Sequence, residues 1–193
     1  MEFPCLDLPI SGLVLIVGEP HTGKSILLAN IALNRMNALE QHMIVYTADR
    51  ASGQFIRNRG IPAEFIRQSY KRSECKRLLA LCQKRMEQHI RQHSLEIYVD
   101  DLEMFRAKWS GIDPCLQQMA LSSERFGIFF LCCSSEFYSV PFAMRQVCDL
   151  IITTSAVSGH FAGVELASQR EKTVRSIDSA GNLRTIAVAS TDL

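Results

Sequence analysis

The sequence lacks the features that would place this protein in a membrane or outside the cell. Among its 193 residues, no apolar run approaches the roughly 20 residues that a helix needs to cross a bilayer. The chain begins Met-Glu-Phe-Pro, without the basic start and apolar stretch of a signal peptide. We therefore expect an intracellular protein that is not secreted and has no membrane partner.

Paired cysteines are also missing. The seven cysteines are an odd number and include no Cys-x-x-Cys pair. A disulfide framework or a zinc site would need even counts or ligand spacing. Most of the cysteines lie within apolar patterns, where a thiol behaves as a small hydrophobic group. We expect buried, reduced thiols.

An excess of charge of one sign is absent as well. The chain has 21 Lys and Arg against 20 Asp and Glu, a net charge of +1, which excludes a histone-like polycation. Apolar residues make up 47% and charged residues 21%, the balance of a globular domain rather than of a disordered chain. Because no repeat or Pro- or Ser-rich linker divides the sequence, we expect a single domain over residues 1–193.

Short apolar segments alternate with segments of helical periodicity. We expect strands at residues 13–17, 43–47, 96–99, 128–133 and 150–153, and helices at 24–39, 70–93 and 114–126, the last capped by Asp113. This alternation predicts an α/β fold with a mostly parallel central sheet covered by helices on both faces, over residues 10–155. In residues 156–193, a turn signal at 179–182 lies between alternating stretches at 163–167 and 184–188. It predicts a C-terminal antiparallel hairpin.

Residues 18–25, Gly-Glu-Pro-His-Thr-Gly-Lys-Ser, fit the phosphate-loop pattern G-x-x-x-x-G-K-[ST]. The motif follows an expected strand and opens an expected helix, so backbone N–H groups can face a phosphate chain at the positive end of that helix. Lys24 would reach the β- and γ-phosphates of ATP, and Ser25 would ligate Mg²⁺. The expected nucleotide contacts are Gly18, Glu19, Pro20, His21, Thr22, Gly23, Lys24, Ser25 and Ile26.

A second acidic motif follows the expected strand at residues 96–99. Asp100 is the candidate for holding Mg²⁺ through water, and Asp101 is the candidate for polarising the attacking water. Glu103 is the alternative base. The other interpretation is that Asp100 and Asp101 only end a strand and cap a loop.

These motifs resemble those of the RecA-like branch of P-loop ATPases. In that branch, a further strand lies between the phosphate-loop strand and the acidic strand, and residues 128–133 are the candidate for it. The resemblance implies that a polar side chain at its end, Ser134 or Ser135, lies near the γ-phosphate and senses its loss. A serine at such a position can equally be an ordinary loop residue.

The stretch from Asp100 to Thr153 resembles the FtsK–HerA group of DNA-translocating ATPases, and more closely the viral genome-packaging ATPases. The matching residues are Val140-Pro141, Met144-Arg145 and Arg125, whereas Phe126 stands where the group has histidine and Ser134-Ser135-Glu136 stands where it has a sensor glutamine. The resemblance implies a Mg²⁺-dependent ATPase that moves double-stranded DNA as an oligomeric ring of identical or paralogous subunits. It would act in the cytoplasm, the nucleus or a virus factory.

In such a ring, an arginine of one subunit stabilises charge on the γ-phosphate bound by its neighbour. Arg125 and Arg145 are the candidates for this catalytic role, with Arg170 as a third. For each of them the alternative is a surface ion pair or a packing role.

The charge is unevenly distributed. Residues 55–93 contain ten Lys or Arg and three Glu, a charge of +7, so the rest of the chain carries −6. This basic segment could contact DNA phosphates without reading sequence. The alternative is a solvated helix face, which is the usual place of a charge run.

Two other functions stay open. Residues 12–18 and 27–32 also resemble recombination ATPases and their paralogues, which would bind single-stranded DNA or a partner protein. The secretion and pilus-retraction ATPases match less well, because no aspartate box or histidine box is found. A non-catalytic subunit that holds nucleotide as a structural ligand would also fit, because Asp101 is shorter than the glutamate that many relatives have there.

Overall fold

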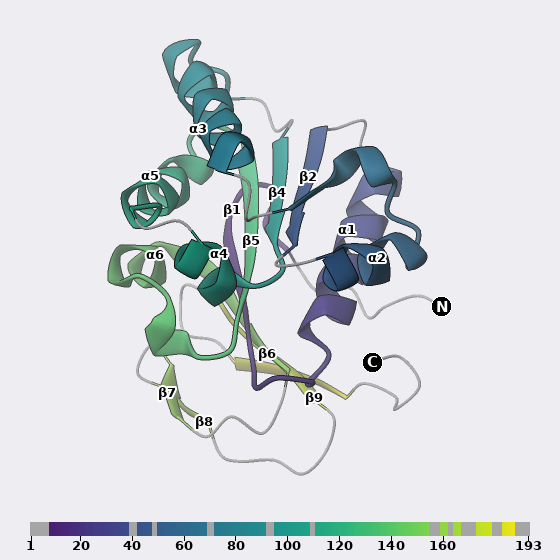
Figure 1. Cartoon of the computed structure of the whole chain (residues 1–193). Coiled ribbons are helices and arrows are strands. Elements are labelled where there is room, and N and C mark those ends of the chain that lie inside the picture. The colour runs from purple at the N-terminus through teal and green to yellow at the C-terminus, as the bar shows by residue number, and fades with distance from the viewer. Residues whose placement is uncertain are drawn as a thin grey trace.

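An eight-stranded sheet with helices on both faces forms the centre of the computed structural model (Figure 1). The structure describes residues 8–38, 42–47, 50–68, 72–91, 95–108, 111–154, 159–161, 164–166, 173–178 and 183–187. Within these ranges, no helix combines the length and the apolar character needed to span a membrane.

The strands of the large sheet run in the order β10-β9-β6-β1-β5-β4-β2-β3. They are β1 (Gly12–Val17), β2 (His42–Thr47), β3 (Ile66–Gln68), β4 (Leu95–Val99), β5 (Ile128–Ser134), β6 (Cys148–Thr153), β9 (Thr173–Asp178) and β10 (Leu183–Ala187). From β6 to β3 all neighbours pair in parallel, and β9 and β10 add an antiparallel edge. Strands β7 (Gly159–Phe161) and β8 (Val164–Leu166) form a separate antiparallel pair. The predicted α/β class is confirmed, and β5 lies between β1 and β4 as the resemblance implied.

Helices cover the two faces of the sheet separately (Figure 1). Helices α1 (Lys24–Ala38) and α2 (Arg50–Asn58) pack on one face. On the other face lie α3 (Arg72–Glu87), α4 (Leu102–Lys108), α5 (Asp113–Ser123) and α6 (Phe142–Gln146). Because both faces are covered, alternate residues of β1 enter different cores: Val14 and Ile16 face α1, and Leu13 and Leu15 face the other layer. This double burial explains why the central strands are continuous apolar runs.

Several short elements were not predicted. Helix α2, strand β3, helix α4 and the 3₁₀ turns η1 (Ala63–Phe65) and η2 (Phe137–Ser139) are too short for a clear periodicity. The predicted cap at Asp113 is wrong, because Ile112 is the N-cap of α5 and the Asp113 carboxylate binds Arg106 instead.

The C-terminal hairpin is confirmed for β9 and β10, although the stretch beginning at residue 163 pairs with β7 rather than with β10. The turn signal at 179–182 lies outside the described residues.

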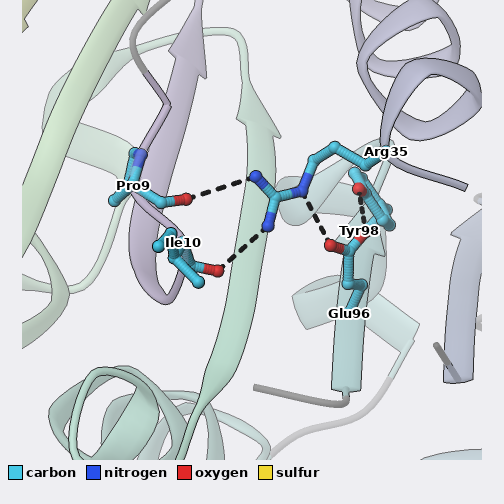
Figure 2. A network of polar contacts seen from close by, with 5 residues as sticks. All are labelled: Pro9, Ile10, Arg35, Glu96 and Tyr98. Atoms are coloured by element: carbon cyan, nitrogen blue, oxygen red, sulfur yellow. Dashed lines mark hydrogen bonds and ion pairs between the residues drawn. The ribbon is translucent and has the colours of Figure 1, made fainter. Parts of the chain in front are cut away.

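A buried polar network joins α1 to β4 (Figure 2). Arg35 donates from Nε to Glu96 Oε1 at 2.7 Å, and Tyr98 donates to Glu96 Oε2 at 2.5 Å. The two terminal nitrogens of Arg35 donate to the carbonyls of Pro9 and Ile10 at 3.2 and 3.0 Å. The end of the helix that follows residues 18–23 is thereby tied to the strand that precedes Asp100.

Candidate nucleotide-binding site

The carboxyl ends of β1, β5 and β6 are bound to one another at one edge of the sheet. Gly18 N donates to Ser134 O at 3.1 Å, and Thr154 N donates to Val17 O at 3.0 Å. Strand β4 ends at the same edge, because it runs parallel to β5. Ligands of open parallel sheets bind outside the carboxyl ends of the strands, so this edge is the expected position of a site.

The loop between β1 and α1 begins in close contact with the end of β6. A Cβ atom on Gly18 would lie 2.3 Å from Thr154 Oγ1 and 2.8 Å from Thr22 Oγ1, so only glycine fits. Thr22 Oγ1 lies 2.7 Å from Thr154 Oγ1 and donates to Glu19 O at 2.7 Å. The loop's entry is therefore held by packing against a strand that is more than 130 residues away in sequence.

Two residues of the loop have a positive φ angle. Gly23 has φ 91°, which glycine adopts without steric cost, and His21 has φ 65° in the left-handed region, where histidine is enriched among non-glycine residues. Helix α1 begins directly afterwards at Lys24. A loop that turns in this way before a helix N-terminus can direct N–H groups at an anion, which fits a phosphate chain.

The Lys24 ammonium lies across this loop. Its Nζ donates to Gly18 O at 2.6 Å and to Glu19 O at 2.8 Å. The three N–H groups of the ammonium can also donate to phosphate oxygens, which are stronger acceptors because they are charged. The lysine is therefore already at the concave side of the loop that the motif predicts for the β- and γ-phosphates.

Asp100 follows β4 and is nearly buried, with 5% of its surface exposed. Burial raises the pKa of the neighbouring Cys133 thiol well above its usual value, and the charge of Asp100 raises it further while Lys24 opposes the rise. Cys133 also contacts Lys24 O through its sulfur at 3.9 Å. Asp100 and the backbone of Lys24 therefore both lie near Cys133 at the end of β5, and Asp100 and Ser25 are the residues that would hold Mg²⁺ together with phosphate oxygens.

Within the described ranges, no group of three or more His, Cys, Asp and Glu side chains could hold a metal ion by themselves.

Asp101 caps helix α4. Its Oδ1 accepts the Met104 N–H at 2.7 Å. For this oxygen, the structure shows the helix-capping role, which is the alternative interpretation from the sequence. The role of Asp101 in polarising water stays a prediction.

Glu103 binds the turn that follows β5. Its Oε1 accepts hydrogen bonds from Ser134 Oγ at 2.5 Å, from Ser139 Oγ at 2.6 Å, and from Ser135 N and Oγ at 2.9 and 3.0 Å. Burial acts to raise the pKa of the Glu103 carboxyl, but the hydrogen bonds from Ser134, Ser139 and Ser135 together outweigh it and hold the pKa below its usual value. The carboxylate is therefore ionised at neutral pH. The sequence indicates Glu103 and the two serines Ser134 and Ser135 separately. Their contact could not be predicted, because no local signal joins residues more than 30 positions apart.

Arg106 extends this cluster to the neighbouring helix. It forms two parallel bonds with the Asp113 carboxylate, at 2.7 and 2.6 Å, and its third nitrogen donates to Ser139 O. The Asp113 bonds raise the pKa of Arg106 above its usual value. Helices α4 and α5 and the turn η2 are thus joined beside the site.

The candidate trans-acting arginines lie outside the loop of their own chain. Arg125 is exposed in the turn before β5, at the edge where β1 and β5 begin, opposite the 18–25 loop. Arg145 of α6 lies 5.3–5.5 Å from the ring centroids of Phe137, Tyr138 and Phe142. Its buried Nε donates to no acceptor in the described part of the chain. Action on a neighbouring subunit stays a prediction for both, and Arg170 lies outside the described residues.

The basic segment is divided between the two faces of the sheet. Helix α2 with the exposed Arg57 lies on one face, and α3 with the exposed Lys76 and Lys84 lies on the other. Arg85 is not part of the solvated face, since it is 7% exposed and donates to Phe126 O at 2.9 Å. Lys71 lies outside the described residues. Lys84 and two other members, Arg67 and Arg77, line a cavity of about 520 Å³ between α3 and the edge of the sheet.

The order of the strands, with β5 between the loop strand β1 and the acidic strand β4, identifies the fold. It is the fold of the RecA-like P-loop ATPases. No protein-family model and no curated protein matches the chain. Solved structures do, and those of the FtsK–HerA type are prominent among them.

The genome-packaging NTPase B204 from Sulfolobus turreted icosahedral virus 2, in complex with AMPPCP, has a TM-score of 0.67 at 12% identity. The match covers 94% of this chain and 100% of that one. EssC (ATPases 2 and 3) from Geobacillus thermodenitrificans has a TM-score of 0.63 at 14% identity and 74% coverage of this chain.

The cytoplasmic domain of the type VII secretion ATPase EccC from Thermomonospora curvata has a TM-score of 0.65 at 14% identity and 93% coverage of this chain. This chain spans about a third of the EssC structure (32%) and a quarter of the EccC structure (24%). At these identities the likeness concerns the fold.

Proposed function

We propose that this protein is a Mg²⁺-dependent ATPase that moves double-stranded DNA as an oligomeric ring, in the manner of a viral genome-packaging enzyme. The observation that carries the proposal is the loop at residues 18–25, across which Lys24 lies, together with the buried Asp100 that follows β4 at the same carboxyl edge of the sheet. The likeness to B204, over 94% of this chain and 100% of that one, supports the packaging role.

The residues would divide the work as follows. The loop N–H groups and Lys24 bind the phosphates, and Ser25 with Asp100 holds the metal. Bound Mg²⁺ supplies positive charge that offsets the charge developing on the β- and γ-phosphates. Asp101 orients the attacking water while its other role is to cap α4. Arg125 or Arg145 acts on the nucleotide of the neighbouring subunit.

The first test is ATP hydrolysis by the purified protein with double-stranded DNA, with single-stranded DNA, and without DNA. We expect duplex DNA to raise the rate, and we expect Lys24→Ala to lose both the basal and the stimulated rate. Stimulation by single strands alone would instead support the recombinase-like alternative. An ATP hydrolysis rate that duplex DNA does not change, under conditions where the protein assembles, would overturn the proposal.

A second test separates the two faces that carry the basic segment. One variant replaces Lys76, Arg77 and Lys84 of α3 by Gln. The other replaces Arg57 of α2 and Arg59, which follows α2, by Gln. Each lost phosphate contact lowers the slope of log K against log salt by about 0.9. The face whose variant has a smaller salt dependence of DNA binding than wild type is the face that contacts DNA. Equal slopes in both variants and in wild type would show that the basic segment is a solvated surface that does not contact DNA.

One observation favours a second candidate, a subunit that binds nucleotide without hydrolysing it. Both possible bases are engaged, Asp101 in the α4 cap and Glu103 with three serines. Turnover that is lost in Lys24→Ala and in Asp101→Asn would exclude this candidate.

A further inference from the structure

The hydroxyl groups around Glu103 have more acceptors than protons. Ser134 Oγ lies within hydrogen-bond distance of Glu103 Oε1 (2.5 Å), Glu136 O (2.7 Å) and Ser139 Oγ (2.9 Å). Ser139 Oγ lies 2.6 Å from Glu103 Oε1 and 2.7 Å from Glu136 O. A serine hydroxyl carries one proton, so it donates to one acceptor at a time. Any further acceptor that reaches the end of β5 must compete with Glu103 for these protons.

The terminal phosphate of a nucleotide in the loop would be such an acceptor. Ser134 O accepts from Gly18 N, so this cluster adjoins the start of the loop. Cys133, the preceding residue, contacts Lys24 O and is close enough to Asp100 for the charge of Asp100 to act on its thiol, so Lys24 and Asp100 both lie near the end of β5. The γ-phosphate is the part of ATP that ADP lacks, so of the two nucleotides only ATP could bring γ-phosphate oxygens to these serines.

Glu103 and a terminal phosphate also repel each other. The carboxylate is half-buried and its pKa is held below the usual value, so it carries its full charge at neutral pH. Charge-assisted hydrogen bonds to a carboxylate are roughly twice as strong as neutral ones. ATP must therefore displace a well-bound competitor of the same charge in order to reach the serines.

We propose that Glu103 is a positioning residue that competes with the terminal phosphate of ATP for the hydroxyl protons of Ser134 and Ser135, and that it thereby lowers the affinity for ATP relative to ADP. This inference rests on the proposed function of the same site. The turn that Glu103 holds continues into η2, whose Phe137 and Tyr138 rings lie beside Arg145. ATP that takes the serines releases this turn and moves the exposed aromatic surface of Tyr138 and Phe142, which are 68% and 63% exposed.

The test compares the affinities for a non-hydrolysable ATP analogue and for ADP, each with Mg²⁺, by isothermal titration calorimetry. Glu103→Gln keeps the size of the side chain but makes its bonds neutral, so the preference for the ATP analogue over ADP should rise by about five-fold. Glu136→Gln is the matched control, because it removes one exposed negative charge from the same turn and leaves the preference unchanged.

Ser139→Ala removes one donor from Glu103 and one hydrogen-bond neighbour of Ser134. Glu103 then depends more on Ser134 and Ser135, so the preference for the ATP analogue over ADP should fall by a small factor, and this variant keeps the inference testable if Glu103→Gln does not fold. A second readout is amide hydrogen exchange in residues 134–140 of the wild-type protein, which should rise with the ATP analogue and not with ADP.

An equal change in both affinities, or an unchanged preference in Glu103→Gln and Ser139→Ala, would overturn the inference while the proposed ATPase stands. Loss of turnover in Glu103→Gln with an unchanged preference would also overturn it, since Glu103 would then be the base. A wild-type protein that binds neither nucleotide would overturn the inference together with the proposed function.

Discussion

Removal of the Arg35 guanidinium should destabilise the protein strongly, because it leaves a carboxylate buried without its cation. The Glu96 side chain is 1% exposed and the Arg35 side chain 13%. In Arg35→Met the apolar stem remains, but the ion pair to Glu96 and the bonds to two carbonyls are lost (Figure 2). The contact of the guanidinium with the Phe129 ring, 3.8 Å from its centroid, is lost as well.

The expected cost follows from the buried pair. Removing one partner of a buried ion pair costs about 3–5 kcal/mol. A domain has roughly 5–15 kcal/mol of stability in total, so Arg35→Met should remove a large part of it. At about 2–4 °C per kcal/mol for a chain of this size, the melting temperature should fall by roughly 6–20 °C.

Urea denaturation followed by circular dichroism measures the effect, and a second variant tests its cause. In Arg35→Met with Glu96→Gln the buried charge is gone and Tyr98 keeps an acceptor, so this double variant should be more stable than Arg35→Met alone by about 1–3 kcal/mol. Arg57→Met, an exposed arginine of α2, is the control and should change stability by less than about 0.5 kcal/mol. A double variant that is no more stable than Arg35→Met would refute the reasoning that the loss of the guanidinium beside a buried carboxylate causes the destabilisation.

Three further outcomes follow from particular contacts. Gly18→Ala should destabilise the protein by about 1–3 kcal/mol and abolish nucleotide binding, because its Cβ would lie 2.3 Å from Thr154 Oγ1, and Thr154→Ala should partly restore both properties. Burial raises the pKa of Cys148 to about 12, so iodoacetamide at pH 8 should modify it only after unfolding, and native alkylation found by peptide mass spectrometry would contradict this.

The Glu103 carboxyl has a pKa below its usual 4.5, so its stabilising contribution is present above pH 4.5 and disappears as the pH falls through the folded pKa. The stability difference between wild type and Glu103→Gln should therefore shrink in acid, and a constant difference from pH 7 to pH 3 would contradict that.

The sequence by itself determined the elements whose signal is local. The loop at residues 18–25 is a continuous motif, and Gly23 and Lys24 perform roles that depend on neighbours within a few residues. Strands β1, β4 and β5 were predictable because a strand buried on both faces must be apolar throughout. The position of β5 between β1 and β4 came from the family resemblance, and the pairing of these strands confirms it.

Tertiary structure alone decided the contacts between distant residues. Arg35 and Glu96 are 61 residues apart, Glu103 and Ser139 are 36 apart, and Thr22 and Thr154 are 132 apart. A charged or polar residue in a helix has the same local pattern whether its partner is water or another side chain. Asp113 illustrates this, since its position before a proline predicts a helix cap, yet the opposing Arg106 binds its carboxylate. Whether a polar side chain caps a helix, forms a buried ion pair or holds a turn depends on which side chains the packing of the sheet and helices brings within 3 Å of it.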